Sequence, residues 1–187
     1  NDGTPVKFVA YYPYNADVRN FNYPVQLAAQ ERGSTACDLL YAATKEEYTY
    51  SPENEPHISL NFTHRLAKVI LKFVNMEKEP LEVSDVRIEG MQTAASFNIQ
   101  TDVLTVDESS VATINPYHNA TTGFYEAIIL PSALTDSYKV SFVLDDREKE
   151  WIFTNLDIAL PQFHKGYSYT FALYIDDSGF VEMGRLE

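Results

Sequence analysis

The sequence predicts an all-β fold, and three observations point to it. The chain contains thirteen Tyr and eleven Phe but only one Trp, and aromatic side chains fit the pleated, half-buried surface of a sheet. Short segments alternate apolar and polar residues, as strands with one buried face do. Turn-forming residues separate these segments about every ten residues, a spacing typical of a β-sandwich.

The first part of the chain predicts one strand, one short helix and a loop. Residues 6–14 have an aromatic strand pattern that is stopped by Pro13, which has no amide hydrogen for a ladder. Residues 24–32 contain helix formers before Gly33, a plausible helix C-cap, so we expect one short helix there. Residues 38–44 are apolar. Residues 48–56 are polar and bounded by proline, which predicts a loop and a domain boundary.

The apolar pattern changes its inward parity between residues 57 and 74. Apolar side chains occupy even positions from Ile58 to Phe62 and odd positions from Val69 to Phe73. A strand cannot change inward parity without an extra residue or a bend, so we expect a bulge or a change of sheet near residues 64–67. A helical stripe through the same segment is the alternative, but the strict alternation and the Ile, Val and Phe content favour strand.

The rest of the chain is a succession of short predicted strands. They span residues 81–89, 95–99, 103–106, 111–114, 124–130, 138–144, 150–154, 167–175 and about 180–183. Residues 124–130 form a nearly continuous apolar run, as expected of a central strand. We expect two hairpins, one across residues 100–102 and one through residues 145–147.

Composition and charge argue against several classes of partner. The formal net charge of −13 speaks against nucleic acid, whose phosphates need clustered Lys and Arg, and against an anionic membrane face. No stretch reaches the ~20 apolar residues of a membrane span, and no signal-peptide pattern is present. Cys37 is the single cysteine, so we expect no intrachain disulfide and a small buried side chain rather than a reactive thiol.

The sequence contains no recognisable catalytic or metal-binding motif. The histidines lack the spacing of a helical zinc site, and no CxxC is present. They are His57, His64, His118 and His164. His64 lies at the parity change and is expected to make a structural hydrogen bond. Asp145-Asp146 and Asp176-Asp177 are expected to bond turn amides, with part of a Ca²⁺ loop as the alternative for the second pair. We therefore predict no enzyme, no catalytic residue, no metal and no cofactor, and the sequence identifies no ligand-binding residue.

Five segments, in order along the chain, carry a resemblance to a known family. They are residues 8–14, 38–42, 60–69, 127–131 and 163–171. Together they resemble the fimbrillin-like (Mfa-like) family of surface proteins from Bacteroides and relatives. The resemblance implies transthyretin-like β-sandwich domains. We expect residues 1–56 to be the closing part of a partial or shortened N-terminal β domain, and residues 57–187 to be a complete C-terminal sandwich.

The same resemblance implies a location and a function. It implies a lipoprotein precursor with a lipid anchor and export to the cell surface, outer membrane or fimbrium, although Cys37 lies inside the domain and cannot be a lipobox cysteine. We expect a structural or adhesive subunit that joins other pilus or surface subunits by β-strand complementation. The candidate donor is residues 180–186 or a strand upstream of Asn1.

Two other functional readings remain. The first is a surface module that binds glycans or proteins of host or bacterial surfaces through exposed aromatic side chains. The second is an enzyme such as a glycosidase accessory domain, which would require a pocket with two converging carboxylates.

Overall fold

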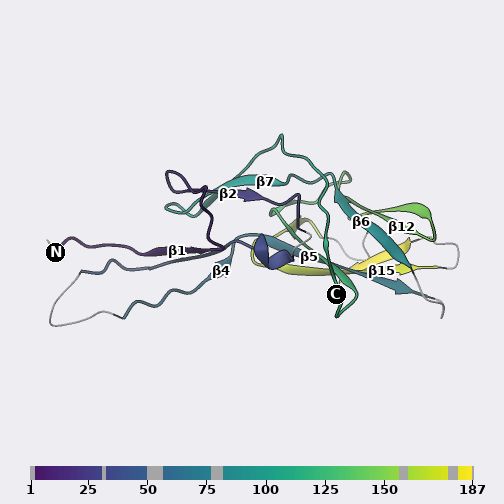
Figure 1. The fold of residues 1–187 in the computed structure, drawn as a ribbon, viewed down its shortest axis with the longest axis horizontal. Coiled ribbons are helices and arrows are strands. Elements are labelled where there is room, and N and C mark those ends of the chain that lie inside the picture. Colours follow the sequence, from purple (N-terminus) through teal and green to yellow (C-terminus); the bar gives the residue numbers. More distant parts are fainter. Residues whose placement is uncertain are drawn as a thin grey trace.

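The structure is a computed structural model that describes residues 3–30, 33–49, 57–76, 82–155, 160–176 and 181–186. Within these ranges the chain forms sixteen strands and one three-residue 3-10 helix, Ser34–Ala36. The strands are arranged in several small sheets (Figure 1). The all-β prediction is therefore confirmed.

Two sheets enclose the larger core. The first has five strands, in the order β16 (Val181–Leu186), β15 (Ser168–Ile175), β5 (Ala67–Asn75), β10 (Phe124–Ile129) and β9 (Tyr117–Asn119). Strands β15 and β5 run parallel, and the other neighbours run antiparallel. The second sheet has the order β13 (Arg147–Ile152), β12 (Lys139–Leu144) and β6 (Val83–Glu89). A separate pair is formed by β11 (Ser132–Ala133) and β14 (Gln162–Phe163).

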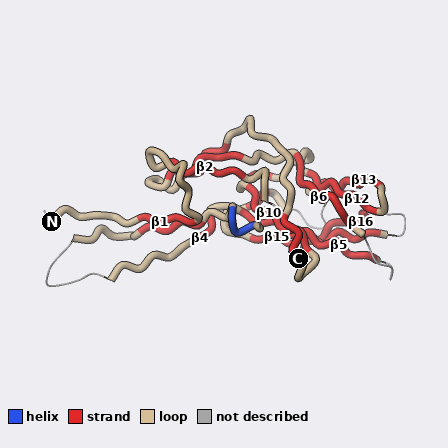
Figure 2. Tube along the Cα trace, viewed as in Figure 1, coloured by secondary structure: helices blue, strands red, loops and turns tan. Residues whose placement is uncertain are grey.

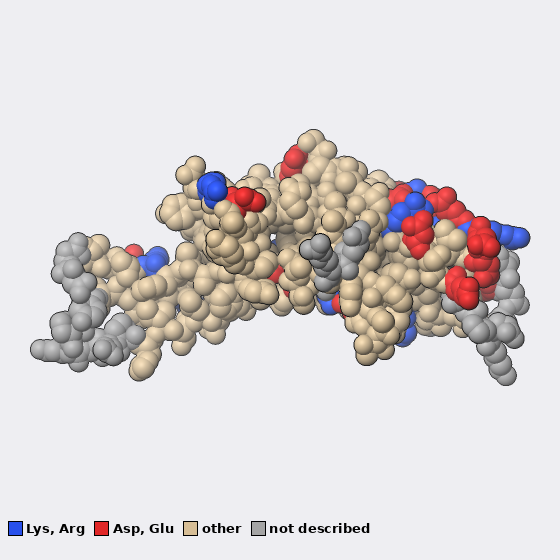
Figure 3. All heavy atoms as spheres, in the orientation of Figure 1, with Lys and Arg blue, Asp and Glu red and all other residues tan. Residues whose placement is uncertain are grey.

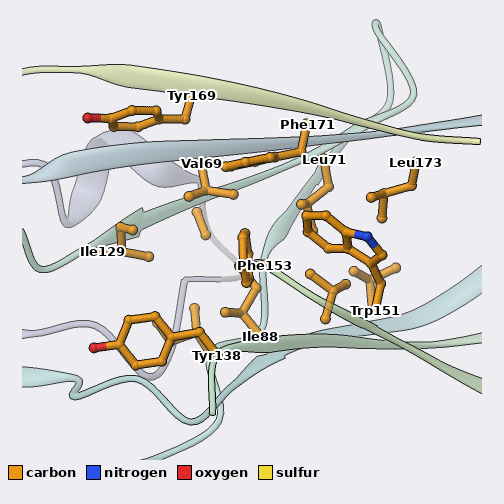
Figure 4. Close-up of a cluster of buried hydrophobic side chains, with 14 of the residues drawn as sticks. Val69, Leu71, Ile88, Ile129, Tyr138, Trp151, Phe153, Tyr169, Phe171 and Leu173 are labelled. Atoms are coloured by element: carbon orange, nitrogen blue, oxygen red, sulfur yellow. The ribbon is translucent and has the colours of Figure 1, made fainter. Parts of the chain in front are cut away.

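Aromatic side chains dominate the larger core (Figure 4). Trp151 and Phe171 both contact Phe153, with ring centroids 5.1 and 5.2 Å away. Along β15, Tyr169, Phe171, Leu173 and Ile175 are buried in this core. Their spacing of two residues is the alternation that the sequence shows. The strand predicted over residues 167–175 is therefore confirmed, with one face buried from residue 169 to 175. Tyr167 continues the pattern but is 63 % exposed.

The second half of strand β10 is buried on both faces. Its residues Ala127 and Ile129 lie in the larger core, whereas Ile128 and the following Leu130 lie in a second core. A strand covered on both faces needs apolar residues at consecutive positions. The prediction of a central strand from the run 124–130 is confirmed.

The second core lies beneath the sheet β2 (Asn22–Gln26), β7 (Ala94–Asn98) and β8 (Val103–Val106). It also receives Tyr41 from β3 (Leu40–Ala43), which forms another sheet between β1 (Val9–Tyr12) and β4 (Thr63–His64). This core therefore contains side chains from both sides of residue 56. The division into domains at that position stays a prediction.

The helix expected over residues 24–32 is wrong in the part that the structure describes. Asn22–Gln26 is strand β2, which pairs with β7 over five residues, and residues 31 and 32 lie outside the described ranges. Tyr23, Val25 and Leu27 are buried at intervals of two. Burial against a strand distant in sequence outweighed a local helix propensity of a few tenths of a kcal/mol per residue.

The change of sheet expected near residues 64–67 is confirmed. Strand β4 pairs with β3, and β5 begins three residues later in the five-stranded sheet. Arg65 holds the junction through an ion pair with Asp102, in which Nε lies 2.7 Å from Oδ1 and Nη2 donates a hydrogen bond to Oδ2 at 2.9 Å. Its guanidinium also lies 4.9 Å from the Tyr41 ring centre. The earlier half of the expected strand is wrong, because residues 57–62 form no strand and Phe62 is 47 % exposed.

Most of the other strands match their predicted ranges. The hairpins β7–β8 and β12–β13 are confirmed, with turns at residues 99–102 and 145–146. Residues 111–114 contribute only isolated bridges at Val111 and Ile114. The last strand is longer than expected within the described residues, and residue 180 lies outside them.

Candidate functional site

A long arm extends from the body of the molecule. It comprises residues 3–12, 40–49 and 57–64. Its base packs on the second core through Tyr11 and Tyr41, and the rest projects away from the body (Figures 1 and 2). Backbone hydrogen bonds continue the β1–β3 pairing towards its tip. Val6 and Tyr48 exchange two bonds of 2.9 Å, and the Thr44 amide donates to the Phe8 carbonyl oxygen at 2.9 Å. The arm is thus an antiparallel extension of the sheet.

Large apolar side chains are exposed along the arm. Of the eleven exposed large hydrophobic residues in the described ranges, five belong to it. They are Val6, Phe8, Val9, Tyr12 and Phe62. Tyr14 follows directly and is 82 % exposed. Exposed apolar residues that gather on one element mark an interaction surface more often than scattered ones do.

The outer edge of β1 is uncharged. Its residues are VAYY, and β3 is the one strand that pairs with it within the described part of the chain. A strand edge presents backbone N–H and C=O groups that another strand can pair with. Tyr11 anchors this edge, since its ring meets the Tyr23 ring of the second core at 5.5 Å. This contact holds the edge in place on the second core.

The edge at β13 has the opposite character. Arg147, Glu148, Lys149 and Glu150 follow one another along it. Arg87 bonds Glu148, and Lys139 bonds both Glu89 and Glu150. Charged side chains gather over this end of the molecule in Figure 3. Charge on an edge strand opposes pairing with another sheet, so this edge is protected whereas β1 is not.

Of the histidines and carboxylates singled out in the sequence, His118, Asp145 and Asp146 line one cavity, and His64 and His164 do not line it. His64 Nδ1 lies 2.8 Å from Asp38 Oδ2, the structural hydrogen bond that was expected. His118 stacks on Tyr125, and His164 contacts Gln162. Within the described ranges, no group of three or more His, Cys, Asp or Glu residues is arranged to hold a metal ion.

The first carboxylate pair lies in a turn, and Asp176 of the second pair directly follows β15. Asp145 and Asp146 form the β12–β13 turn with φ of +47° and +62°. Asp177 of the second pair lies outside the described residues. Adjacent turn residues of this kind are typical of tight hairpins.

Cys37 is half buried rather than fully buried. Its Sγ lies 3.9 Å from the Ala29 carbonyl oxygen. Burial, and then the neighbouring Asp38 carboxylate, raise the pKa of its thiol. A raised pKa lowers the thiolate fraction at neutral pH, so the side chain is a weak nucleophile.

The sequence did not reveal that the arm is exposed. Residues 6–14 have the same aromatic alternation as buried strands such as 167–175. Whether a second layer covers a strand depends on the path of distant segments, which local pattern does not report. Two features of the sequence could have indicated the exposure of the arm, namely Pro13, which ends the strand pattern, and the polar segment that begins at Tyr48.

Among the described residues, no helix is long and apolar enough to cross a membrane.

The fold is similar to solved structures from Bacteroides. The match to a "putative cell adhesion protein" of Bacteroides uniformis covers 100 % of this chain and 73 % of the length of that protein, with a TM-score of 0.82 and 24 % identity. The match to a second "putative cell adhesion protein", from Bacteroides ovatus, covers 97 % of this chain and 65 % of the length of that protein, with a TM-score of 0.70 and 16 % identity. At these identities the likeness establishes the fold.

A curated relative from Bacteroides uniformis, "Putative fimbrium subunit Fim1C", is 26 % identical over 194 residues. The match covers 100 % of this chain but 62 % of the relative's length. The fimbrillin-like family model matches residues 1–184. That family is structural and non-enzymatic, so the expectation that the chain is not an enzyme is confirmed. Because the family model spans nearly every residue, the chain belongs to the fimbrillin-like family.

Proposed function

We propose that the chain is a structural or adhesive subunit of a fimbrium or related cell-surface structure, and that it assembles through β-strand complementation at the β1 edge. The observation that carries the proposal is the uncharged edge of β1 on an arm with exposed apolar side chains. The names of the relatives, a fimbrium subunit and a cell adhesion protein, agree with this function. Its partners are other pilus or surface subunits, and its place is the cell surface, with a lipid anchor in the precursor.

Strand addition at β1 would form two kinds of contact. Backbone groups of the incoming strand pair with those of residues 9–12, which supplies affinity. Side chains on one face of the partner would lie beside Val9 and side chains on its other face beside Tyr12, because these two positions differ in parity. Val9 and Tyr12 are 43 % and 53 % exposed, and these contacts supply specificity. Covering these side chains removes apolar surface from water, at roughly 25 cal/mol per Å².

The proposal includes the finer architecture. Two facing sheets around an aromatic core support a transthyretin-like sandwich formed mainly by residues 57–187. The pairing of β1 with β3, both within residues 1–56, supports the reading of this range as the closing part of an N-terminal domain. The 62 % coverage of the relative's length is compatible with further sequence in the whole protein.

Charging the β1 edge is expected to suppress assembly. The double variant Val9→Lys/Tyr12→Lys should reduce self-association about tenfold or more, because lysines on an edge strand oppose pairing. The control Gln100→Lys/Thr101→Lys adds the same charge in the exposed β7–β8 turn. Sedimentation velocity measures the association of all three proteins. Equal association of the edge variant and the control would exclude β1 as the pairing edge.

The C-terminal segment is the candidate donor. In the monomer Val181–Leu186 is the edge strand β16, paired with β15 of the same chain. If a neighbouring molecule takes up this strand, deleting residues 180–187 should abolish self-association, measured by light scattering. Unchanged scattering would eliminate the C-terminal donor and leave a strand upstream of Asn1.

The alternative function, a glycan- or protein-binding module, is favoured by the aromatic residues on and beside the arm. Phe8, Tyr12 and Tyr14 are 40 %, 53 % and 82 % exposed. This function requires binding to a surface ligand without an added strand, so a glycan array without hits would count against it.

A further inference from the structure

A large cavity lies at the end of the sandwich away from the arm. Its volume is about 710 Å³, within the range of ligand sites in proteins. The lining residues come from the far part of β5, the starts of β6 and β10, the strand β9, and the end of β12 with its turn. The two sheets of the larger core part here, and the cavity opens between them. None of the expected interaction edges contributes to it.

One wall of the cavity is aromatic and rigidly held. The His118 ring stacks on the Tyr125 ring with centroids 4.6 Å apart and planes at 24°. Phe73 meets the same tyrosine edge-on at 5.8 Å. The Tyr125 hydroxyl donates to the Val83 carbonyl oxygen at 3.0 Å, which ties the five-stranded sheet to β6. A wall fixed on both sheets needs little reorganisation on binding.

The other lining groups make the cavity acidic. Glu82, Asp145 and Asp146 contribute carboxylates, and the lining contains no Lys or Arg among the described residues. The whole chain carries a net charge of −13, which adds to the negative potential. An anionic ligand is repelled by this field, and the described residues show no metal-ligand group.

We infer that this cavity binds a primary ammonium group carried on an aliphatic chain. The ammonium would bond the carboxylates of Asp145 and Asp146, and its chain would lie against the aromatic wall. Charge-assisted hydrogen bonds are about twice as strong as neutral ones, and aromatic faces attract cations and cover methylene groups. Two sources offer this chemistry, a lysine side chain of a partner protein and a free polyamine.

The test titrates the full chain with two probes and follows backbone amides by NMR. One probe is a pentapeptide with blocked, uncharged termini and a single lysine, and its control is the same peptide with that lysine acetylated at the side-chain amine. The other probe is 1,4-diaminobutane. Both amines should shift the amides of Ser84 and Gly123, which line the cavity, and the acetylated peptide should not. Tighter binding of the peptide assigns the site to a protein partner, and tighter binding of the diamine assigns it to a polyamine.

Two variants and a matched control test the residues. Asp145→Asn/Asp146→Asn keeps side chains that tolerate positive φ and should weaken binding about tenfold or more. Ser84→Trp should fill the cavity and abolish binding. Glu46→Gln/Glu47→Gln removes the same charge from the exposed arm and should leave affinity unchanged. Absence of amide shifts with both amines, equal shifts with the acetylated peptide, or equal weakening by the control would overturn the proposal.

Discussion

Replacing Gly90 by alanine is expected to destabilise the protein by about 4 kcal/mol. Gly90 follows β6 with φ of +85°, and a Cβ there would lie 2.0 Å from the Ser137 carbonyl oxygen. That oxygen belongs to the backbone just before β12, so it cannot rotate away as a side chain would. The β6–β12 ladder would have to open at the end where Glu89 faces Lys139. Denaturant unfolding and the melting temperature, lower by about 10 °C, measure the effect.

Gly123 is the control for this substitution. It also has a positive φ, of +73°, but no atom lies within 4 Å of its built Cβ. Gly123→Ala should therefore cost only the backbone strain, about 1 kcal/mol. The difference between the two variants isolates the contact with Ser137. Equal destabilisation would show that the close approach at Gly90 is relieved without cost.

The second large effect on stability is expected at Gln30. Its buried side chain pairs with the backbone of β10 where a neighbouring strand would otherwise do so. Strand β9 pairs with β10 only as far as Glu126. Beyond that point the Gln30 Oε1 accepts from the Ile128 amide at 2.7 Å, and its Nε2 donates to the Ile128 carbonyl oxygen at 2.6 Å. The same Nε2 donates to the Leu27 carbonyl oxygen at 2.7 Å. One side chain thus continues the sheet and joins it to the second core.

Gln30→Met keeps the volume but removes these bonds, and we expect a loss of about 3 kcal/mol in the free energy of unfolding. The reason is that the Ile128 amide and the carbonyl groups of Ile128 and Leu27 each lose a hydrogen-bond partner. A buried group without a partner costs roughly 1–3 kcal/mol. Gln26→Met, at an exposed position of β2, should change stability by less than about 0.5 kcal/mol. Similar unfolding midpoints for the two variants would refute the role of Gln30 as a strand substitute.

Strands with regular alternation were predictable, and segments decided by distant partners were not. Residues 167–175 and 124–130 carry enough local pattern to identify a one-sided and a two-sided strand. Residues 22–26 do not, because the helix formers around Leu27 mask the alternation of Tyr23 and Val25. Pairing with β7, some seventy residues away, made this segment a strand. Contacts of such sequence separation are invisible to a local pattern.

The candidate sites were less predictable than the fold. The apolar β1 sequence was evident, but its exposure depends on the absence of a covering layer over the arm in the described structure. Asp145 and Asp146 were identified as turn residues. Their position opposite His118 and Tyr125 follows from the way two sheets meet, and no spacing along the chain reports it.

By itself the sequence determined the period of two, the change of parity at residues 64–67, the acidic charge and the family. These depend on residue type and short spacing, which act locally and survive in any arrangement of the strands. Only the tertiary structure decided which edges are covered, where Gln30 completes a sheet, and which aromatic and acidic side chains share a cavity. Each of these is a contact between segments far apart in the chain, and its free energy comes from burial that exists only once the layers have packed.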